Sequence, residues 1–256
     1  MGEDRPGAAL VTGAAVRIGR AIALDLARHG WAVAVHYNRS SAEARAVVAE
    51  ITGGGGRAVA LAADLADEAE AQELVPRAGA ALGPVTCLVN NAAAFERDCF
   101  ATATRDSWDL HIAVNLRAPL VLAQAFARQL PEDAAGNIVN LIDQRVWNLT
   151  PHFLSYSVSK AGLWALTRTL ALALAPRIRV NAIGPGPTLP SRRQTRAQFA
   201  AQAASVPLGH GATPDQICDA VRFVLAAPAM TGQMMALDGG QHLGWAESKR
   251  TQMSEE

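Results

Sequence analysis

The stretch LVTGAAVRIG, residues 10–19, reads as a short apolar strand, a turn of small residues and the start of a helix. A turn that leads from a strand into a helix exposes unpaired backbone N–H groups and the positive end of the helix dipole, which suits a pyrophosphate. Gly13 and Gly19 would let such a group approach the backbone closely. This stretch therefore predicts the first unit of a nucleotide-binding α/β fold.

The same alternation of strand and helix continues along the chain. Seven short runs are apolar throughout, as expected of parallel strands that are covered on both faces. They span residues 8–12, 32–36, 58–62, 87–90, 138–141, 180–183 and 234–237. Segments with helical periodicity span residues 19–29, 42–51, 68–82, 108–130, 153–174 and 214–225. This order predicts a single-domain, doubly wound Rossmann fold with a seven-stranded, mainly parallel sheet and helices on both faces.

The chain has 256 residues, of which 50% are hydrophobic, and this is enough to bury one substantial core. We expect one domain over residues 1–245. Residues 188–211 follow the sixth strand and are polar and rich in Arg, Gln and Ala, which indicates a substrate lid with a short helix. Residues 246–256 are expected to form a polar tail.

Composition excludes several classes of function. The 23 basic and 23 acidic residues balance, so nothing predicts a nucleic-acid or membrane partner. Cys87, Cys99 and Cys218 lack metal-ligand spacing and are expected to be small apolar residues, so no metal is predicted. The first seven residues lack the apolar core of a secretion signal, and no stretch approaches the roughly 20 apolar residues that span a bilayer. A cytoplasmic protein is expected.

Tyr156 and Lys160 are four residues apart, a spacing that places both side chains on one face of a helix. Such a pair is common by chance, but here it follows the run Val89-Asn90-Asn91-Ala92-Ala93, a helical Asn115, and Asp143 thirteen residues before the tyrosine. In this order and at these distances, the set resembles the short-chain dehydrogenase/reductase family over nearly the whole chain.

The resemblance implies a reductase in which Tyr156 donates the proton that accompanies hydride transfer. A free tyrosine has a pKa of about 10, and a nearby ammonium favours the phenolate, so Lys160 is expected to lower the pKa of Tyr156. In the family this lysine also holds the nicotinamide ribose. Asn115 resembles the residue that supports a water path to the lysine.

The end of the second strand indicates which nicotinamide cofactor is used. Enzymes that use NAD commonly place an acid there, which accepts hydrogen bonds from the ribose 2′-OH and would repel a 2′-phosphate. Here residues 36–40 read HYNRS, with no carboxylate until Glu43. Arg39 can pair with the phosphate, and Ser40 adds a hydroxyl donor. NADPH is therefore the predicted cofactor.

The family pattern implies further cofactor contacts. Asp64 and Leu65 match the position that meets the adenine, Asn91 and Ala92 follow the fourth strand, and the residues after the sixth strand flank the nicotinamide carboxamide. The full predicted set is Gly13, Arg17, Ile18, Gly19, Tyr37, Asn38, Arg39, Ser40, Asp64, Leu65, Asn91, Ala92, Tyr156, Lys160, Pro185, Gly186 and Thr188.

Three residues depart from the common family pattern. Arg17 replaces a glycine, Asp143 replaces a serine, and Phe95 follows the Asn-Asn-Ala turn. An ionised aspartate cannot donate to a carbonyl and would repel a developing alkoxide. It suits a nitrogen heterocycle, whose N–H groups need an acceptor. Together the three departures resemble the pteridine reductase branch of the family.

By that resemblance, Phe95 would stack on a pterin opposite the nicotinamide, and Phe153 would form another wall. Arg17 would direct a cation at phosphate or substrate. The predicted substrate-binding residues are Arg17, Phe95, Asp143, Phe153 and Tyr156. Ala93 stands where members of the branch often have a serine, so one hydrogen bond to substrate would be lost.

The sequence thus predicts an NADPH-dependent reductase of dihydropterins or related pteridines, dihydrofolate included. A carbonyl reductase, for example of 3-oxoacyl thioesters, is an alternative that Asp143 disfavours. A dinucleotide-binding sensor without turnover is another, although it need not retain Tyr156, Lys160 and Asn115 together. A homo-oligomer, with a tetramer favoured, is expected because the family pairs long helices across two-fold axes.

Overall fold

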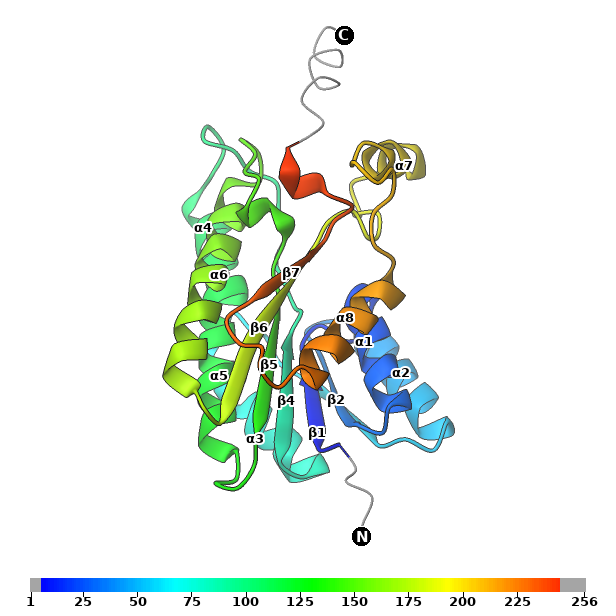
Figure 1. Ribbon diagram of the computed structural model, residues 1–256, viewed down its shortest axis with the longest axis vertical. Helices are drawn as coiled ribbons and strands as arrows, with labels where there is room; N and C mark the ends of the chain where they lie inside the picture. Colours follow the sequence, from blue (N-terminus) through cyan, green and yellow to red (C-terminus); the bar gives the residue numbers. More distant parts are fainter. Residues whose placement is uncertain (1–5, 245–256) are drawn as a thin grey trace, which may run out of the picture.

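The computed structural model of the protein describes residues 6–244. Its centre is one seven-stranded sheet in which every pair of neighbouring strands is parallel (Figure 1). The strands are β1 (Ala8–Val11), β2 (Ala32–Tyr37), β3 (Ala58–Ala62), β4 (Val85–Asn90), β5 (Gly136–Leu141), β6 (Ile178–Pro185) and β7 (Met234–Leu237). Their order is β3-β2-β1-β4-β5-β6-β7. The predicted doubly wound fold is confirmed.

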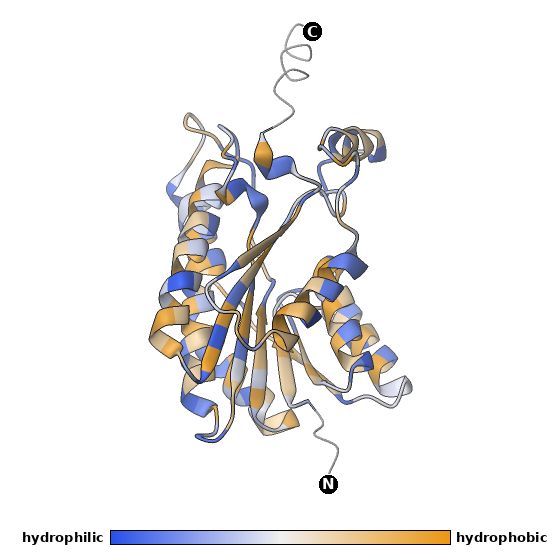
Figure 2. Cartoon of the chain, in the orientation of Figure 1, coloured by the Kyte–Doolittle hydropathy of each residue, from blue (hydrophilic) through white to orange (hydrophobic). Residues whose placement is uncertain are grey.

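Helices cover both faces of the sheet, and the sequence explains this arrangement. All four residues of β1 are buried, and alternate residues face opposite cores. One core contains α1 (Arg17–Arg28), α2 (Ser41–Gly53) and α8 (Pro214–Ala226), and the other contains α3 (Glu68–Leu82), α5 (Ala118–Gln129) and α6 (Leu154–Leu174). The buried hydrophobic residues of these helices pack against the strands in the two cores, and most of the central strands are coloured as hydrophobic in Figure 2.

The strand order places a crevice at the middle of the sheet. β1 lies between β2 and β4. The helix that follows β1, α1, covers one face of the sheet, and the helix that leads from β4 to β5, α5, covers the other. Ligands of open α/β sheets bind at such a switch point, outside the carboxyl ends of the strands. The turns that follow β1, β4, β5 and β6 all meet at this edge, and they carry most of the predicted site residues.

The helix predicted over residues 108–130 is longer and is not regular. It consists of α4 (Arg105–Ile112), a π turn η1 (Ala113–Arg117) and α5, and Thr104 caps it through a capping box with Ser107. The whole run of 25 residues is long and apolar enough to cross a membrane by composition, so the prediction that no stretch approaches this length was wrong. Half of its most apolar window is buried in the fold, as in a core helix.

The predicted lid contains a helix, α7 (Arg196–Ala204), which Thr195 and Gln198 cap. It lies above the carboxyl edge of the sheet, at the upper right of Figure 1. The predicted tail at residues 246–256 lies outside the described residues, as does residue 245.

Candidate functional site

Two adjoining cavities occupy the carboxyl edge of the sheet. The first has a volume of about 440 Å³ and the second about 630 Å³, and Arg17, Ile18, Asn91 and Ala93 line both. Each is within the range of small-molecule sites in proteins. The first cavity lies along the turn after β1, and the second lies beneath the predicted lid.

The turn after β1 is shaped to bring a ligand close to the backbone. Gly13 has a φ of +62°, a conformation that favours glycine. A Cβ atom at Gly19 would overlap the carbonyl oxygen of Gly13 and the amide of Asn91. Both glycines are therefore required by the local geometry. Since the turn opens into the N-terminus of α1, the residues present fit the diphosphate of a dinucleotide.

Hydrogen bonds tie this turn to the one after β4. Thr12 Oγ1 accepts from the backbone N–H groups of Asn91 and Ala92, at 2.9 and 3.0 Å. The side-chain amide of Asn91 donates to the carbonyl oxygens of Thr12 and Gly13, at 2.8 and 3.2 Å. The floor of the first cavity is thereby a rigid unit built from two separate turns.

His36 contributes to the same floor, a role that its place in the sequence does not indicate. Its Nδ1 accepts from the N–H of Gly13 at 3.0 Å, so the proton is on Nε2, which donates to the carbonyl of Ala63 at 3.1 Å. Burial lowers the pKa of His36 to about 4, which keeps the ring neutral. In the sequence, the only indication of this role is that His36 is a single polar residue at the end of an apolar strand.

Most of the predicted cofactor residues line the two cavities. Those on the first cavity are Gly13, Arg17, Ile18, Gly19, Asn38, Arg39, Asp64, Leu65, Asn91 and Ala92. Those on the second are Arg17, Ile18, Asn91, Tyr156, Lys160, Pro185, Gly186 and Thr188. Tyr37 and Ser40 line neither of them. Tyr37 packs against the core beside α1 and α2, and Ser40 is the residue that precedes α2.

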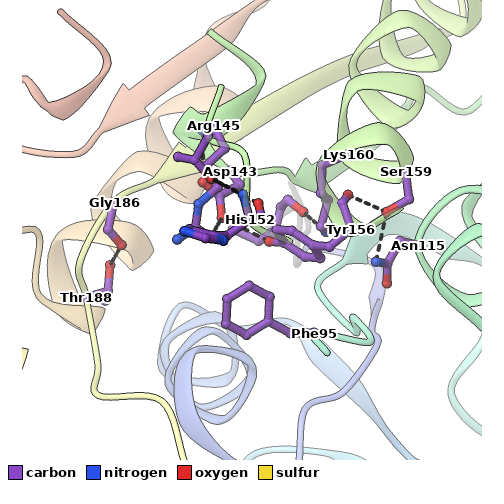
Figure 3. A network of polar contacts seen from close by, with 12 residues as sticks. Phe95, Asn115, Asp143, Arg145, His152, Tyr156, Ser159, Lys160, Gly186 and Thr188 are labelled. Atoms are coloured by element: carbon purple, nitrogen blue, oxygen red, sulfur yellow. Dashed lines mark hydrogen bonds and ion pairs between the residues drawn. The ribbon is translucent and has the colours of Figure 1, made fainter. Parts of the chain in front are cut away.

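Tyr156 and Lys160 project from α6 toward the second cavity, where Asp143 follows β5 (Figure 3). The hydroxyl of Tyr156 donates to Asp143 Oδ2 at 3.0 Å. The ammonium of Lys160 donates to the carbonyl of Leu141 at 2.8 Å and lies 5.9 Å from the centroid of the Tyr156 ring. The structure thus brings three of the four predicted catalytic side chains together; the fourth is Asn115.

The pKa of Tyr156 differs from the expectation. Burial raises it well above the ordinary value for tyrosine, and the negative charge of Asp143 raises it further. The prediction that Lys160 lowers this pKa was wrong for this structure, because the carboxylate is the charge nearest to the hydroxyl and the ammonium is directed at Leu141. Burial also lowers the pKa of Lys160 to about 8.

Asn115 lies in the π turn and connects two parts of the site. Its Oδ1 accepts from the N–H of Ala94 at 2.8 Å, and its Nδ2 donates to the carbonyl of Ala94 and to Ser159 Oγ, both at 3.0 Å. Ser159 in turn donates to the carbonyl of Tyr156 at 2.7 Å. Asn115 therefore fixes the backbone just before Phe95 to the helix that carries Tyr156. Its role on a water path stays a prediction.

Phe95 and Phe153 lie together at the second cavity. Their ring centroids are 4.6 Å apart with an angle of 5° between the planes, and the Tyr156 ring meets Phe95 edge to face at 4.7 Å. Phe153 has a φ of +58°, which is rare for a residue with a side chain. The two predicted aromatic walls thus form one stack beside the tyrosine.

A buried polar network supports this stack, and the sequence did not indicate it. Phe153 donates its N–H to the carbonyl of Asp98 at 2.7 Å. The carboxylate of Asp98 accepts from the N–H of Ser155 at 3.2 Å and, through a short hydrogen bond, from its hydroxyl. Since the residue at the start of α6 makes no capping hydrogen bond of its own, Asp98 caps this helix from a distant loop.

His111 completes the network from α4. Its Nε2 accepts from the N–H of Glu96 at 3.0 Å, so its Nδ1 carries the proton and donates to Ser155 Oγ at 2.7 Å. Burial lowers the pKa of His111. A neutral histidine thereby joins the segment that follows Phe95 to the residue that precedes Tyr156.

Arg17 connects the first turn of α1 to the predicted lid. Its guanidinium donates to the carbonyls of Pro190 at 2.8 Å and Leu189 at 3.3 Å, and its φ is +57°. Two arginines that the sequence did not single out also lie here. Arg145 pairs with Asp143 at 3.5 Å, and Arg193 pairs with Glu96 at 3.0 Å.

Comparisons with known proteins agree with this geometry. Residues 13–242 match the family described as enoyl-(acyl carrier protein) reductase. The chain is 49% identical to FolM alternative dihydrofolate reductase 1 from Brucella canis, whose crystal structure was determined in complex with NADP, with a TM-score of 0.92 over 94% of this chain and 96% of that one. It is 36% identical to an NADP-complexed short chain dehydrogenase from Burkholderia cenocepacia, with a TM-score of 0.86 over 91% and 97%.

A relative known by sequence points the same way. The chain is 33% identical to 3-oxoacyl-(acyl-carrier-protein) reductase from Synechocystis sp., over 91% of this chain and 95% of that protein. The parallel sheet, the glycine turn after β1 and the pair of Tyr156 and Lys160 are all consistent with these relatives. The chain belongs to the short-chain dehydrogenase/reductase family.

Proposed function

We propose that this protein is an NADPH-dependent reductase that acts on a dihydropterin or a related pteridine, dihydrofolate included. The observation that carries the proposal is the 3.0 Å hydrogen bond from Tyr156 to Asp143. It places a carboxylate acceptor beside the proton donor, where a heterocycle with ring N–H and amino groups would find partners for both. The likeness to a FolM alternative dihydrofolate reductase at 49% identity supports it.

NADPH fits the first cavity and would supply the hydride. Gly13 and Gly19 would take its diphosphate at the start of α1, and Asp64 and Leu65 would meet its adenine. Arg39 would pair with the 2′-phosphate, and no carboxylate follows β2 until Glu43. The NADP complexes of the Brucella and Burkholderia structures support this choice of cofactor. Lys160 would hold the nicotinamide ribose.

The chain's own residues would place and protonate the substrate. Because its pKa is raised, Tyr156 keeps its proton through the neutral range and can donate it to a ring nitrogen. Asp143 would accept hydrogen bonds from the ring N–H and amino groups. The stack of Phe95 and Phe153 would offer a flat aromatic face to the ring.

A carbonyl reductase of 3-oxoacyl thioesters is the second candidate, favoured by the 33% identity to a 3-oxoacyl-(acyl-carrier-protein) reductase. Asp143 argues against it, because a carboxylate there would repel a developing alkoxide. A sensor without turnover is also less consistent with the site, since Tyr156, Lys160 and Asn115 are all present and connected through α6.

The test is NADPH oxidation by the purified protein with dihydrobiopterin, dihydrofolate and an acetoacetyl thioester. We expect the pteridines to be reduced fastest. In Asp143→Ser, pteridine reduction should fall by about 10²-fold, the usual worth of one positioned acid or base, while thioester reduction stays level or rises. Asp133→Ser, at an exposed turn, serves as the control. A wild type that reduces only the thioester would support the carbonyl reductase, and no turnover with any substrate would support the sensor.

We also infer a homo-oligomer, with a tetramer favoured. In support, α6 and α4 expose large apolar side chains outside both cavities, among them Leu172 with 83% exposure and Trp108 with 38%. Light scattering of the protein as it elutes from a size-exclusion column would give the number of subunits. A cytoplasmic location is likewise a proposal, and fractionation of cells that express the protein would test it.

A further inference from the structure

The second cavity carries an excess of positive charge. Among the residues that line it, the cations are Arg17, Arg97, Arg145, Lys160 and Arg193, and the single carboxylate is Asp143. The whole chain, by contrast, has 23 basic and 23 acidic residues. A cleft lined by one sign of charge concentrates ligands of the opposite sign. Arg17 already donates to the carbonyls of Leu189 and Pro190, and in the proposed function Lys160 holds the nicotinamide ribose. The other three arginines need a separate explanation.

Two of these arginines lie beside the aromatic stack. The Cζ atom of Arg193 is 5.1 Å from the ring centroid of Phe95 and 5.6 Å from that of Phe153, and the Cζ atom of Arg145 is 5.5 and 5.0 Å from the same centroids. An atom almost equidistant from two parallel rings 4.6 Å apart lies at their edges and not over a face. Ring edges carry partial positive charge, so the stack does not neutralise these cations.

The partners of the three arginines differ. Arg145 forms an ion pair with Asp143 at 3.5 Å, and 17% of each side chain is exposed. Arg193 donates to Glu96 at 3.0 Å and to the carbonyl of Phe95 at 2.7 Å. The Arg193–Glu96 pair is 39% and 64% exposed, and exposed pairs contribute little free energy, so a ligand anion can replace the glutamate. The exposed side chain of Arg97 makes no ion pair within residues 6–244.

We propose that Arg97 and Arg193 form a subsite for an anionic substituent, a carboxylate or a phosphate, on the side chain of the pteridine substrate. The inference rests on the proposed function, because it takes the stack of Phe95 and Phe153 as the wall for the ring. Arg193 bonds to the backbone of Phe95, and Arg97 follows two residues later, so a substituent leaving the stacked ring reaches both. The planar guanidinium fork matches the geometry of both carboxylate and phosphate.

The experiment compares three substrates that share the dihydropterin ring. Dihydrofolate carries carboxylates, dihydroneopterin monophosphate carries a phosphate, and dihydrobiopterin has a neutral side chain. The readout is the KM of each anionic substrate divided by the KM of dihydrobiopterin. We expect Arg193→Gln and Arg97→Gln each to raise this ratio about tenfold, the effect of losing a hydrogen bond to a charged group.

Two further variants sharpen the test. Glu96→Gln should lower the ratio, because it removes the carboxylate that competes with the ligand for Arg193. Arg105→Gln is the matched control, since Arg105 pairs with Asp109 on the exposed side of α4, outside both cavities. Added salt should reduce the difference in KM ratio between wild type and the arginine variants, because it screens the attraction between the arginines and the anionic substrate.

A rise confined to dihydrofolate identifies a carboxylate subsite, and a rise confined to dihydroneopterin monophosphate identifies a phosphate subsite. Ratios in Arg193→Gln and Arg97→Gln that match Arg105→Gln would overturn the subsite alone, with the reductase activity intact. A wild type that reduces none of the three substrates would overturn the proposed function and the subsite together.

Discussion

The hydroxyl of Tyr156 donates a 3.0 Å hydrogen bond to the carboxylate of Asp143, and both groups face the same cavity. Burial and the charge of Asp143 raise the pKa of Tyr156 well above its ordinary value. Asp143 thus keeps Tyr156 protonated, and a bound substrate would have to hydrogen-bond to the same carboxylate. A ring with N–H donors can use that acceptor, whereas a plain ketone brings nothing for it to accept.

Removing the hydroxyl tests Tyr156 as the donor. Tyr156→Phe should lower turnover of the pteridine by 10²-fold or more, because the positioned acid is lost. NADPH should still bind, since the ring and its contacts remain. The measurement is single-turnover NADPH oxidation together with a fluorescence titration of NADPH. Retention of most of the activity would show that another group, with Asp143 the first suspect, supplies the proton.

Cofactor preference should depend on Arg39. Arg39→Ala should weaken NADPH binding by roughly 1.5–3 kcal/mol, the worth of a hydrogen bond to a charged group, and leave NADH binding almost unchanged. The dissociation constants of both cofactors, measured by calorimetry, give the answer. Arg45→Ala, on an exposed position of α2, is the control. An equal loss for the two cofactors would contradict the role of Arg39.

Lys160 should make stability depend on pH. Its pKa falls from 10.5 to about 8 on folding, so between these values the unfolded chain binds more protons and the free energy of unfolding rises with pH. Below pH 8 the full cost of the buried charge is present. Lys160→Met should therefore be more stable than wild type at pH 7, by up to roughly 3 kcal/mol, with a smaller difference toward pH 10.

The measurement is urea unfolding of wild type and Lys160→Met across this range of pH. A difference in stability that does not change with pH would show that the lysine carries no such penalty. The variant should also be nearly inactive, because Lys160 is the residue proposed to hold the nicotinamide ribose.

His111 should matter for catalysis as well as for stability. His111→Leu leaves the N–H of Glu96 without its partner, at a cost of about 1–3 kcal/mol, and removes the donor to Ser155 Oγ, which keeps its hydrogen bond to Asp98. Because Ser155 directly precedes Tyr156, kcat should fall and the KM of the pteridine should rise. Thermal unfolding and steady-state kinetics measure the two effects. A lower Tm with unchanged kinetics of the folded fraction would mean that the network is only structural.

The fold could be predicted because its signals are local. Each strand is a short apolar run, and runs buried on both faces of a parallel sheet need no tertiary information to be recognised. Helix ends were less predictable, because some caps are not local. The start of α6 is capped by Asp98, 57 residues before Ser155 in the chain. The π turn around Asn115 depends on contacts with Ala94 and Ser159 that no periodicity reveals.

The candidate site divides in the same way. Residues within sequence motifs, such as Gly13, Tyr156 and Lys160, could be found from spacing. His36 and Arg193 could not, because His36 bonds to Gly13 across 23 residues and Arg193 to Glu96 across 97. The spacing of Tyr156 and Lys160 also could not show that the tyrosine is buried and hydrogen-bonded to Asp143, and these two features raise the pKa that was expected to be lowered.

The π turn at Ala113–Arg117 constrains how this protein can change in length. A π turn holds one more residue than a regular helical turn, so the extra residue is absorbed there and α5 keeps the rotation relative to α4 that a regular helix would give it. Phe126 and Leu122 thereby stay fully buried. Losing one residue from the π turn would restore a regular helix, whereas losing one residue from α4 or α5 would rotate the residues that follow by about 100° and turn apolar side chains away from the core. Packing of this helix should therefore tolerate a change of one residue in length at the π turn and not within α4 or α5.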